Sequence, residues 1–359
     1  MKTTQVSLQL LWISLICSLL LSSCETDSGK PTPATGCRIQ KYTAVIQQPG
    51  SQHVQNEQAI FTYDNEGKLI KADSSWTISG GSSGLDNGNS STVATYTYNA
   101  EGFLTAANSQ TVRQTMIGTG NTKTDHRSLN TTFTYTQGKL TGYLANSVSF
   151  YGLATNVTGT FEYDAAGNVV KQTAVNTYTY DPNVVKEVPG YPSGWQRTWI
   201  YTDKQLTDYI EKRGAAETHP YTIQNGLVTK ATYPESYTLF EYDNQQRLTK
   251  YQFFNGNKLN SYYTQTWNEG KPFFTSLPAF KGFPELQPIM GKVGVWKTFN
   301  YYADYPGSGI AQLTSISNTI QLNGEDFVSQ AVTEHKDLTP GIPSQTGSRT
   351  ENYTYTGCK

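Results

Sequence analysis

The sequence predicts an all-β protein: an antiparallel up-and-down meander of about 16–20 strands that forms a curled sheet or a flattened barrel. Three observations predict it. The 359 residues include 25 Tyr, 31 Gly and 49 Thr, which are typical of strands and of the turns between them. A short unit of aromatic and polar residues recurs along the chain. Beyond the N-terminal segment, no long stretch has the period of an amphipathic helix.

The recurring unit runs aromatic, polar, Tyr, turn, apolar. In its first copy Phe61 and Tyr63 alternate with Thr62, which puts the two rings on one face of a strand. Asp64 then opens a turn, and Gly67 supplies the positive φ that lets the chain reverse. Each copy therefore predicts a β-hairpin. The full copies are 61–69, 96–104, 161–169 and 240–248, and shorter turns occur in 133–140 and 199–206.

The charge of the chain is nearly balanced. There are 27 Lys and Arg against 28 Asp and Glu, and charged residues make up 15% of the chain. A nucleic-acid-binding protein would carry a basic excess, so this class of partner is excluded. An aromatic content of 13% argues against a chain that is disordered throughout.

Residues 1–23 read as a secretory signal peptide, with a basic residue, an apolar core and small residues at its end. The sequence Leu21-Ser22-Ser23-Cys24 resembles the bacterial lipoprotein box. This resemblance implies cleavage before Cys24, lipidation of Cys24 and attachment of the protein to a membrane through its N-terminus. The alternative is an ordinary signal peptide followed by a Cys by chance.

Residues 24–36 are polar and rich in Pro, Thr and Gly, which predicts a flexible tether. The acidic start of this segment resembles the surface-export tags of Bacteroidota lipoproteins. The expected location is the outer membrane, and whether the domain faces the periplasm or the cell surface stays open.

Two cysteines remain in the mature chain besides Cys24. Cys37 begins the predicted β domain of residues 37–358, and Cys358 ends it. In the oxidising envelope we expect a disulfide between them, with two free thiols as the alternative. The bridge requires that the two ends of the fold meet. In an up-and-down meander this happens only when the number of strands is even.

The hairpin units resemble the tyrosine-aspartate repeats of RHS-type proteins, which build long antiparallel sheets. The combination of a lipoprotein box, Tyr-rich hairpins and a late aromatic insertion is similar to a Bacteroidota lipoprotein domain family with a proposed porin-like fold. The resemblance implies a single β-repeat domain in the cell envelope and carries no catalytic residues.

The insertion is the segment 271–294, where the alternating pattern gives way to Pro and aromatic residues. Its prolines prevent a continuous strand or helix, and its apolar side chains must be buried against something. We expect it to plug or cap one end of the sheet, and a ligand-binding or partner surface is the alternative.

A sheet with one aromatic face can also hide that face in lipid. A membrane-spanning sheet needs strands with long apolar outer faces. The stretch 69–78 instead carries Lys71 and Asp73 on one face. The sequence therefore favours a sheet that is held at the membrane by the lipid anchor alone.

The sequence contains no recognisable catalytic nucleophile, metal-ligand set or cofactor loop. The four His are scattered, and no second His or carboxylate accompanies any of them at the spacing of a metal site. We therefore expect no cofactor and no metal, and we assign no catalytic residue.

One aromatic cluster is a candidate ligand site. Trp195, Arg197 and Trp199 alternate, so they are expected to share one face of a strand. Aromatic rings beside polar groups are typical of sugar-binding surfaces. In the alternative interpretation Trp199 takes the place of the repeat Phe in the core and Trp195 lies at a loop edge.

These features favour a non-enzymatic binding or structural module of the cell envelope, with a glycan or an envelope protein as partner. The alternative is an extracytoplasmic enzyme that acts on polysaccharide, with acidic residues that are scattered in sequence and brought together by the fold.

Overall fold

The computed structural model describes residues 36–80, 88–117, 121–149, 153–179, 195–284, 286 and 290–358. The signal peptide of residues 1–23 and Cys24 lie outside this part of the chain. The described residues form 21 strands and one short 3-10 helix. The predicted all-β meander is confirmed. Within the described ranges, no helix has both the length and the apolar character needed to cross a membrane.

The first ten strands are β1 (Arg38–Gln47), β2 (Val54–Tyr63), β3 (Leu69–Ser79), β4 (Gly88–Tyr98), β5 (Leu104–Ile117), β6 (Asn121–Thr136), β7 (Lys139–Val148), β8 (Ala154–Tyr163), β9 (Val169–Thr179) and β10 (Trp195–Thr202). They are followed by β11 (Gln205–Arg213), β12 (Ala216–Thr218), β13 (Tyr221–Gln224), β14 (Leu227–Thr232), β15 (Ser236–Tyr242), β16 (Leu248–Asn255), β17 (Lys258–Asn268), the 3-10 helix η1 (Phe273–Ser276), β18 (Val295–Tyr305), β19 (Gly309–Leu322), β20 (Val328–Asp337) and β21 (Gln345–Thr356).

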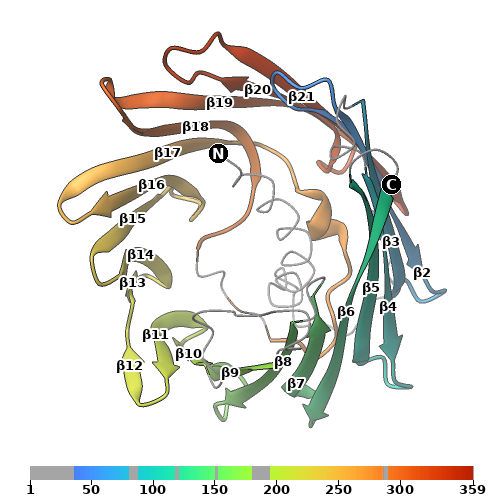
Figure 1. The fold of residues 1–359 in the computed structure, drawn as a ribbon. Coiled ribbons are helices and arrows are strands. Elements are labelled where there is room, and N and C mark those ends of the chain that lie inside the picture. The colour runs from blue at the N-terminus through green and yellow to red at the C-terminus, as the bar shows by residue number, and fades with distance from the viewer. Residues whose placement is uncertain are drawn as a thin grey trace.

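Apart from β12 and β13, each strand pairs with its neighbours in sequence, and every pairing between the described strands is antiparallel. The first strand also pairs with the last, β1 with β21. As Figure 1 shows, the sheet curls so that one face points inward and the other outward.

The hydrogen-bonded ladder is interrupted between β12 and β13. β12 pairs with β11 and β13 pairs with β14, while His219 and Pro220 separate the two short strands. Pro220 has no backbone N–H, so it cannot continue the ladder at this point. The sheet is therefore curled but not closed by hydrogen bonds. Across the gap, the rings of Tyr209 and Tyr221 stack with centroids 4.7 Å apart.

The interruption also explains the strand number. β12 and β13 run in the same direction, because β1 is antiparallel to β21 and the direction alternates at each remaining hydrogen-bonded step along the sheet. For chain direction they count as one strand that Pro220 divides. The alternation of directions is therefore that of an even number of strands, as the meeting of the two ends requires.

The predicted hairpin turns have a common hydrogen-bond pattern. The Asp64 Oδ1 accepts the backbone N–H groups of Glu66 and Lys68 at 2.9 and 2.8 Å. Gly67 has a φ of 82°, a conformation that side chains disfavour. The shorter turns have two central residues, and Gln137 and Gly138 both have positive φ. That conformation matches the twist of the strands it joins.

The repeat Tyr ties neighbouring strands together beside these turns. Its hydroxyl donates to the backbone carbonyl at or near the start of the preceding strand. This contact recurs as Tyr63 to Ile39, Tyr98 to Leu69, Tyr135 to Leu104, Tyr163 to Leu140, Tyr242 to Val228 and Tyr355 to Val328, at 2.6–2.9 Å. On β17 the indole N–H of Trp267 makes the same contact with Leu248 at 2.9 Å.

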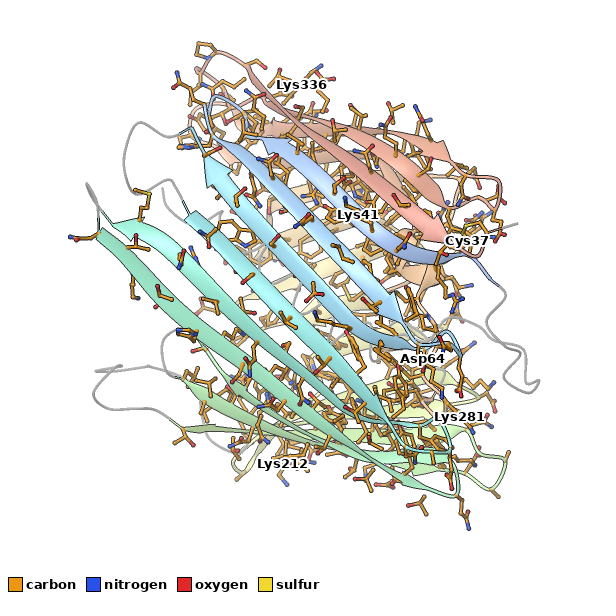
Figure 2. All side chains as sticks on the ribbon, turned by 90° about the vertical axis from the view of Figure 1, so that its right-hand side faces the viewer. Cys37, Lys41, Asp64, Lys212, Lys281 and Lys336 are labelled. Atoms are coloured by element: carbon orange, nitrogen blue, oxygen red, sulfur yellow. A yellow bond between two sulfur atoms is a disulfide. The ribbon has the colours of Figure 1, made fainter. Side chains whose placement is uncertain are left out.

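The two ends of the sheet differ. We call the end with the turns at 64–68, 99–103, 164–168 and 243–247 the turn end; the turns at 214–215, 256–257 and 306–308 mark the far end. Figure 2 shows Cys37, Asp64 and Lys281 at the turn end. The main core lies on the inner face there, built on the strand starts Leu104, Leu140, Val169 and Leu206.

The insertion between β17 and β18 packs into this core, inside the curl of the sheet (Figure 1). Phe280, Phe283 and Leu286 join the cluster, and the Phe283 ring lies 5.2 Å from that of Phe133. The Gly282 carbonyl also accepts the backbone N–H of Leu140 at 2.9 Å. These contacts agree with the expected plug over one end of the sheet.

Candidate functional site

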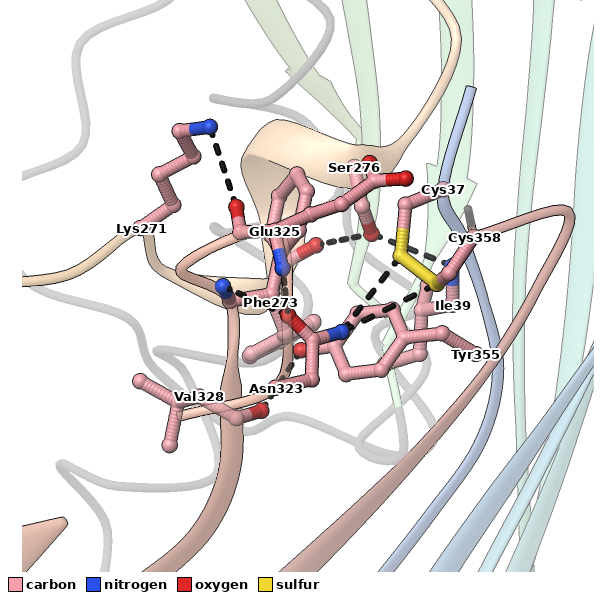
Figure 3. Close-up of a disulfide and its surroundings, with 11 residues drawn as sticks. Cys37, Ile39, Lys271, Phe273, Ser276, Asn323, Glu325, Val328, Tyr355 and Cys358 are labelled. Atoms are coloured by element: carbon pink, nitrogen blue, oxygen red, sulfur yellow. Dashed lines mark hydrogen bonds between the residues drawn. A yellow bond between two sulfur atoms is a disulfide. The ribbon is translucent and has the colours of Figure 1, made fainter. Parts of the chain in front are cut away.

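The structure contains the disulfide between Cys37 and Cys358, which joins residues 321 positions apart. Figure 3 shows its surroundings, where the Asn323 side chain lies against it. The amide nitrogen of Asn323 is 3.5 Å from the Cys37 sulfur and 3.7 Å from the Cys358 sulfur. The bridge therefore fastens the first and last strands to the β19–β20 turn.

The insertion braces the same region. The Ser276 hydroxyl accepts the backbone N–H of Ile39 at 3.1 Å, and the Lys271 ammonium donates to the Glu325 carbonyl at 3.0 Å (Figure 3). Asn323 opens a turn as Asp64 does, because its Oδ1 accepts the N–H groups of Glu325 and Phe327. This is a further copy of the hairpin turn, in which Asn replaces Asp.

β10 places Trp195, Arg197 and Trp199 on the inner face of the sheet. Trp195 is opposite Asn176 of β9 and Trp199 is opposite Gln172, and both of these partners are buried. Directly opposed residues of an antiparallel pair point to the same face. The three predicted residues therefore lie together.

Their side chains form a ladder of rings and guanidinium groups. The Arg197 guanidinium carbon lies 4.8 Å from the Trp195 ring centroid and 5.8 Å from that of Trp199. On the neighbouring strand β11, the guanidinium of Arg213 lies 4.7 Å from the Trp195 ring. The Trp195 ring is thus contacted by two cations, an arrangement in which the guanidinium charge is attracted to the ring face.

Two donors of this ladder have no partner among the described residues. The indole Nε1 of Trp195 and the Nε of Arg197 are both buried without a hydrogen bond. The other end of the Arg197 side chain donates to Asn176 Oδ1 at 3.4 Å. A buried donor without an acceptor costs about 1–3 kcal/mol. A ligand that brings acceptors to these two nitrogen atoms would recover that cost.

The charge of the ladder is positive. The Glu211 carboxylate lies 3.5 Å from the Arg213 guanidinium and accepts the Tyr209 hydroxyl at 2.9 Å. Burial raises the pKa of Tyr209, which keeps this hydroxyl protonated as a donor. Arg197 makes no ion pair with any described residue. Among the described residues, one guanidinium charge of the ladder is therefore without a counter-ion.

Trp199 and Trp195 have different surroundings. Trp199 packs against the core cluster of the turn end, and its ring centroid is 5.4 Å from that of Tyr209. Trp195 is the first residue of β10, so it lies farther along the strand from this core than Trp199 does. Trp199 thus serves as a core residue and as one wall of the ladder, while Trp195 is the ring with polar neighbours.

Asn176, Glu211 and Arg213 are site residues that the sequence interpretation missed. The alternation in β11 signals that Tyr209, Glu211 and Arg213 share a face. Their position beside β10 follows only from the strand register, which pairs Trp195 with Arg213.

A second group of charges on the inner face is fully engaged. Arg349 lies 3.2 Å from Glu57 and 3.0 Å from Glu351, and the Tyr42 hydroxyl is 3.1 Å from each carboxylate. Gln55 also donates to Glu57 at 2.6 Å. Two carboxylates thus share one guanidinium. This cluster ties β1, β2 and β21 together and leaves no cation free.

His219 has two carboxylate neighbours in the folded chain. Its Nδ1 lies 3.0 Å from Asp208, and its Nε2 lies 3.7 Å from Glu217. Strand pairing brings Asp208 close although it is eleven residues away in sequence. Within the described ranges, no group of three or more His, Cys, Asp or Glu is arranged to hold a metal ion.

A cavity of about 320 Å³ opens at the turn end between β13 and β15. Its apolar wall includes Leu227, Phe240 and Tyr242, and Asp243 is its carboxylate residue. The Asp243 carboxylate is already bound by the Arg247 side chain at 2.8 Å and by the N–H groups of the turn. The carboxylate of this cavity is therefore already hydrogen-bonded, whereas the Trp–Arg ladder has two buried donors without a partner among the described residues.

Comparison with known proteins leaves the family open. No protein-family model matches the sequence, and no curated protein matches it. Among solved structures, the chain is similar to a porin-like protein from Bacteroides uniformis, with 14% identity and a TM-score of 0.37, over 88% of this chain and 97% of that one. A DUF4623 family protein from Bacteroides eggerthii has 7% identity and a TM-score of 0.15, over 89% of this chain and 100% of that one.

Proposed function

We propose that this protein is a lipid-anchored protein of the cell envelope that binds a glycan on the inner face of its sheet. The observation that supports binding is the Trp–Arg ladder. There, the Trp195 ring lies beside two buried donors, its own Nε1 and the Nε of Arg197, that have no partner among the described residues.

A sugar ring supplies what this site lacks. Its apolar C–H face packs on an indole ring, and its hydroxyl or carboxylate oxygens accept hydrogen bonds at the rim. The Arg197 guanidinium, held between Trp195 and Trp199, is a rigid fork of donors. The site therefore favours a ring-shaped ligand with acceptors on its edge.

The proposed anchor is the lipidated Cys24, which would hold the β domain at the outer membrane through the tether of residues 24–36. The lipoprotein-box resemblance of residues 21–24 supports it. Growth with labelled palmitate should label the wild-type protein, whereas Cys24→Ser should remain unlabelled. Protease digestion of intact cells would then show whether the domain faces the surface or the periplasm.

Binding can be tested with the full-length protein purified in detergent. A glycan array should identify ligands, and titration calorimetry should show that Trp195→Ala weakens them roughly tenfold or more. Tyr302→Ala is the matched control. Tyr302 is opposite Tyr262, and the rings of these two residues stack with centroids 4.4 Å apart; the neighbouring Tyr263 packs with the inner ring Tyr251. This control removes a ring from the outer face.

The outcomes separate the alternatives. If no glycan binds, or if Trp195→Ala binds as the wild type does, the proposed site is wrong. If bound polysaccharide is cut and reducing ends accumulate, the protein is an enzyme. Capture of an envelope protein without glycan binding would favour the protein-partner role.

A further inference from the structure

A second Trp–Arg pair lies on the inner face, on the wall formed by β2 to β6. Strand register aligns five inward residues in one row across these strands, namely Glu57, Trp76, Ser90, Arg113 and Asp125. Sequence alternation alone does not reveal this row, because it joins residues from five strands.

The geometry of this pair resembles that of the ladder on β10. The Arg113 guanidinium carbon lies 6.0 Å from the Trp76 ring centroid. The Nε of Arg113 is buried and has no hydrogen-bond partner among the described residues. Between the two strands that carry the pair, β4 contributes the small buried residue Ser90. Because this residue is small, the Trp76 ring and the Arg113 guanidinium can approach each other across β4.

The two acids of this row form ion pairs with cations other than Arg113. Asp125, directly opposite Arg113, forms an ion pair with Lys123 at 2.9 Å. Glu57, directly opposite Trp76, is bound by Arg349 at 3.2 Å. In the described part of the chain Arg113 itself makes no ion pair, as is the case for Arg197 on β10.

The two sites share one design. Each has an indole ring and a guanidinium whose buried Nε has no hydrogen-bond partner among the described residues. Each also has a carboxylate that forms an ion pair with a second cation, Lys123 or Arg213. Figure 1 shows β3–β5 on one side of the curled sheet and β10–β11 on another, so the two pairs belong to different walls of the inner face. Arg349 differs, because two carboxylates share it.

We propose that Trp76 and Arg113 form a second subsite and that the ligand is an acidic glycan, whose carboxylate or sulfate groups bind Arg113 and Arg197 while sugar rings pack on Trp76 and Trp195. This inference rests on the proposed glycan binding. A guanidinium binds planar carboxylate or sulfate oxygens through paired hydrogen bonds. Two cationic subsites on separate walls suit a chain with repeated charges better than a single sugar.

The test uses calorimetric titration of the full-length protein with three polysaccharides: polygalacturonate for carboxylates, chondroitin sulfate for sulfates, and dextran as the neutral control. Wild type should bind an acidic polymer more tightly than dextran. Arg113→Gln and Trp76→Ala should each weaken the acidic polymer roughly tenfold. Lys71→Gln, on the outer face of the same strand as Trp76, where Lys71 pairs with Asp73, should have no effect.

A second measurement isolates the new subsite. In the Trp195→Phe/Trp199→Phe protein, the fluorescence of the remaining indoles should still change with galacturonate oligomers, and adding Arg113→Gln should abolish the change. Arg113→Lys, which keeps the charge but loses the fork, should restore part of it.

The outcomes distinguish this inference from the proposed function. If Trp195→Ala loses binding while Trp76→Ala and Arg113→Gln bind as the wild type does, the first site is supported and the second is overturned. Loss only in the Trp76 and Arg113 variants would keep the second and overturn the first. Equal affinity for dextran and the acidic polymers would overturn the acidic ligand, and absence of all glycan binding would overturn both proposals.

Discussion

The hydroxyl of Tyr98, at the end of β4, donates a hydrogen bond of 2.9 Å to the backbone carbonyl of Leu69, at the start of β3. These strands are not joined by a turn at this end of the sheet, so the contact fastens one hairpin turn to the next. Burial raises the pKa of Tyr98, so the hydroxyl remains a donor over the whole physiological range. The recurrence of this contact explains why the repeat needs Tyr where Phe would satisfy packing alone.

Replacing Tyr98 with Phe should lower the free energy of unfolding by about 1–3 kcal/mol, since the ring is kept and the Leu69 carbonyl loses its donor. Urea denaturation measures this change. The control is Tyr237→Phe, because Tyr237 stacks on Phe254 and its hydroxyl bonds no described residue. Equal shifts of the urea midpoint in the two variants would contradict the role of the hydroxyl.

Replacing both Cys37 and Cys358 with Ser should destabilise the protein by up to about 5 kcal/mol, because the unfolded chain loses a loop of 321 residues. The melting temperature of the double variant should be lower than that of the wild type and should not respond to reductant. A non-reduced digest of the wild type should yield the linked peptide by mass spectrometry. Two free thiols in that digest would refute the bridge.

Replacing Glu211 with Gln should raise the affinity for acidic glycans several-fold, because Arg213 loses its counter-ion and a second guanidinium charge becomes available beside Trp195. Affinity for neutral glycans should stay the same. Glu334→Gln, an exposed acid paired with Lys336, is the control. A weaker acidic-glycan affinity in Glu211→Gln would mean that the carboxylate itself contacts the ligand.

Replacing Phe283 with Ala should cost about 3 kcal/mol of stability, since its ring fills the space between Phe133 and Phe280. Thermal unfolding followed by circular dichroism measures this loss. Phe254→Ala, which removes a ring stacked on the outer face against Tyr237, should cost less. If Phe283→Ala melts like the wild type, the insertion does not support the core.

His219 should titrate above the ordinary range of His, because its hydrogen bond to Asp208 and the nearby charges raise its pKa. The folded pKa exceeds the unfolded one. Its contribution to stability is therefore complete below pH of about 6.5 and is lost as pH rises through the folded value. NMR titration should show His219 shifted upward and His335, whose pKa burial lowers, shifted downward. Asp208→Asn should return His219 toward its ordinary value, and an unshifted His219 in the wild type would disprove the contact.

Much of the fold could be predicted from the sequence because its signals are local. The alternation of Phe61, Thr62 and Tyr63 defines the two faces of a strand, and Asp64 with Gly67 encodes the turn that follows. The disulfide was also predictable, since Cys37 and Cys358 stand at the two limits of the repeats. The sequence does not predict the break at Pro220. A proline interrupts the pairing of strands only where its missing N–H would face a neighbouring strand, and that depends on the fold.

The sequence by itself determined the all-β class, the hairpin turns and the shared face of Trp195, Arg197 and Trp199, because each depends on neighbours along the chain. Only the tertiary structure decided which residues stand beside them. Arg213 contacts the Trp195 ring, and Arg113 contacts the Trp76 ring. Both contacts depend on the register between strands, which the alternation within one strand does not reveal. Likewise, only the folded sheet shows that Asp125 pairs with Lys123 and Glu57 with Arg349, while Arg113 makes no ion pair with a described residue.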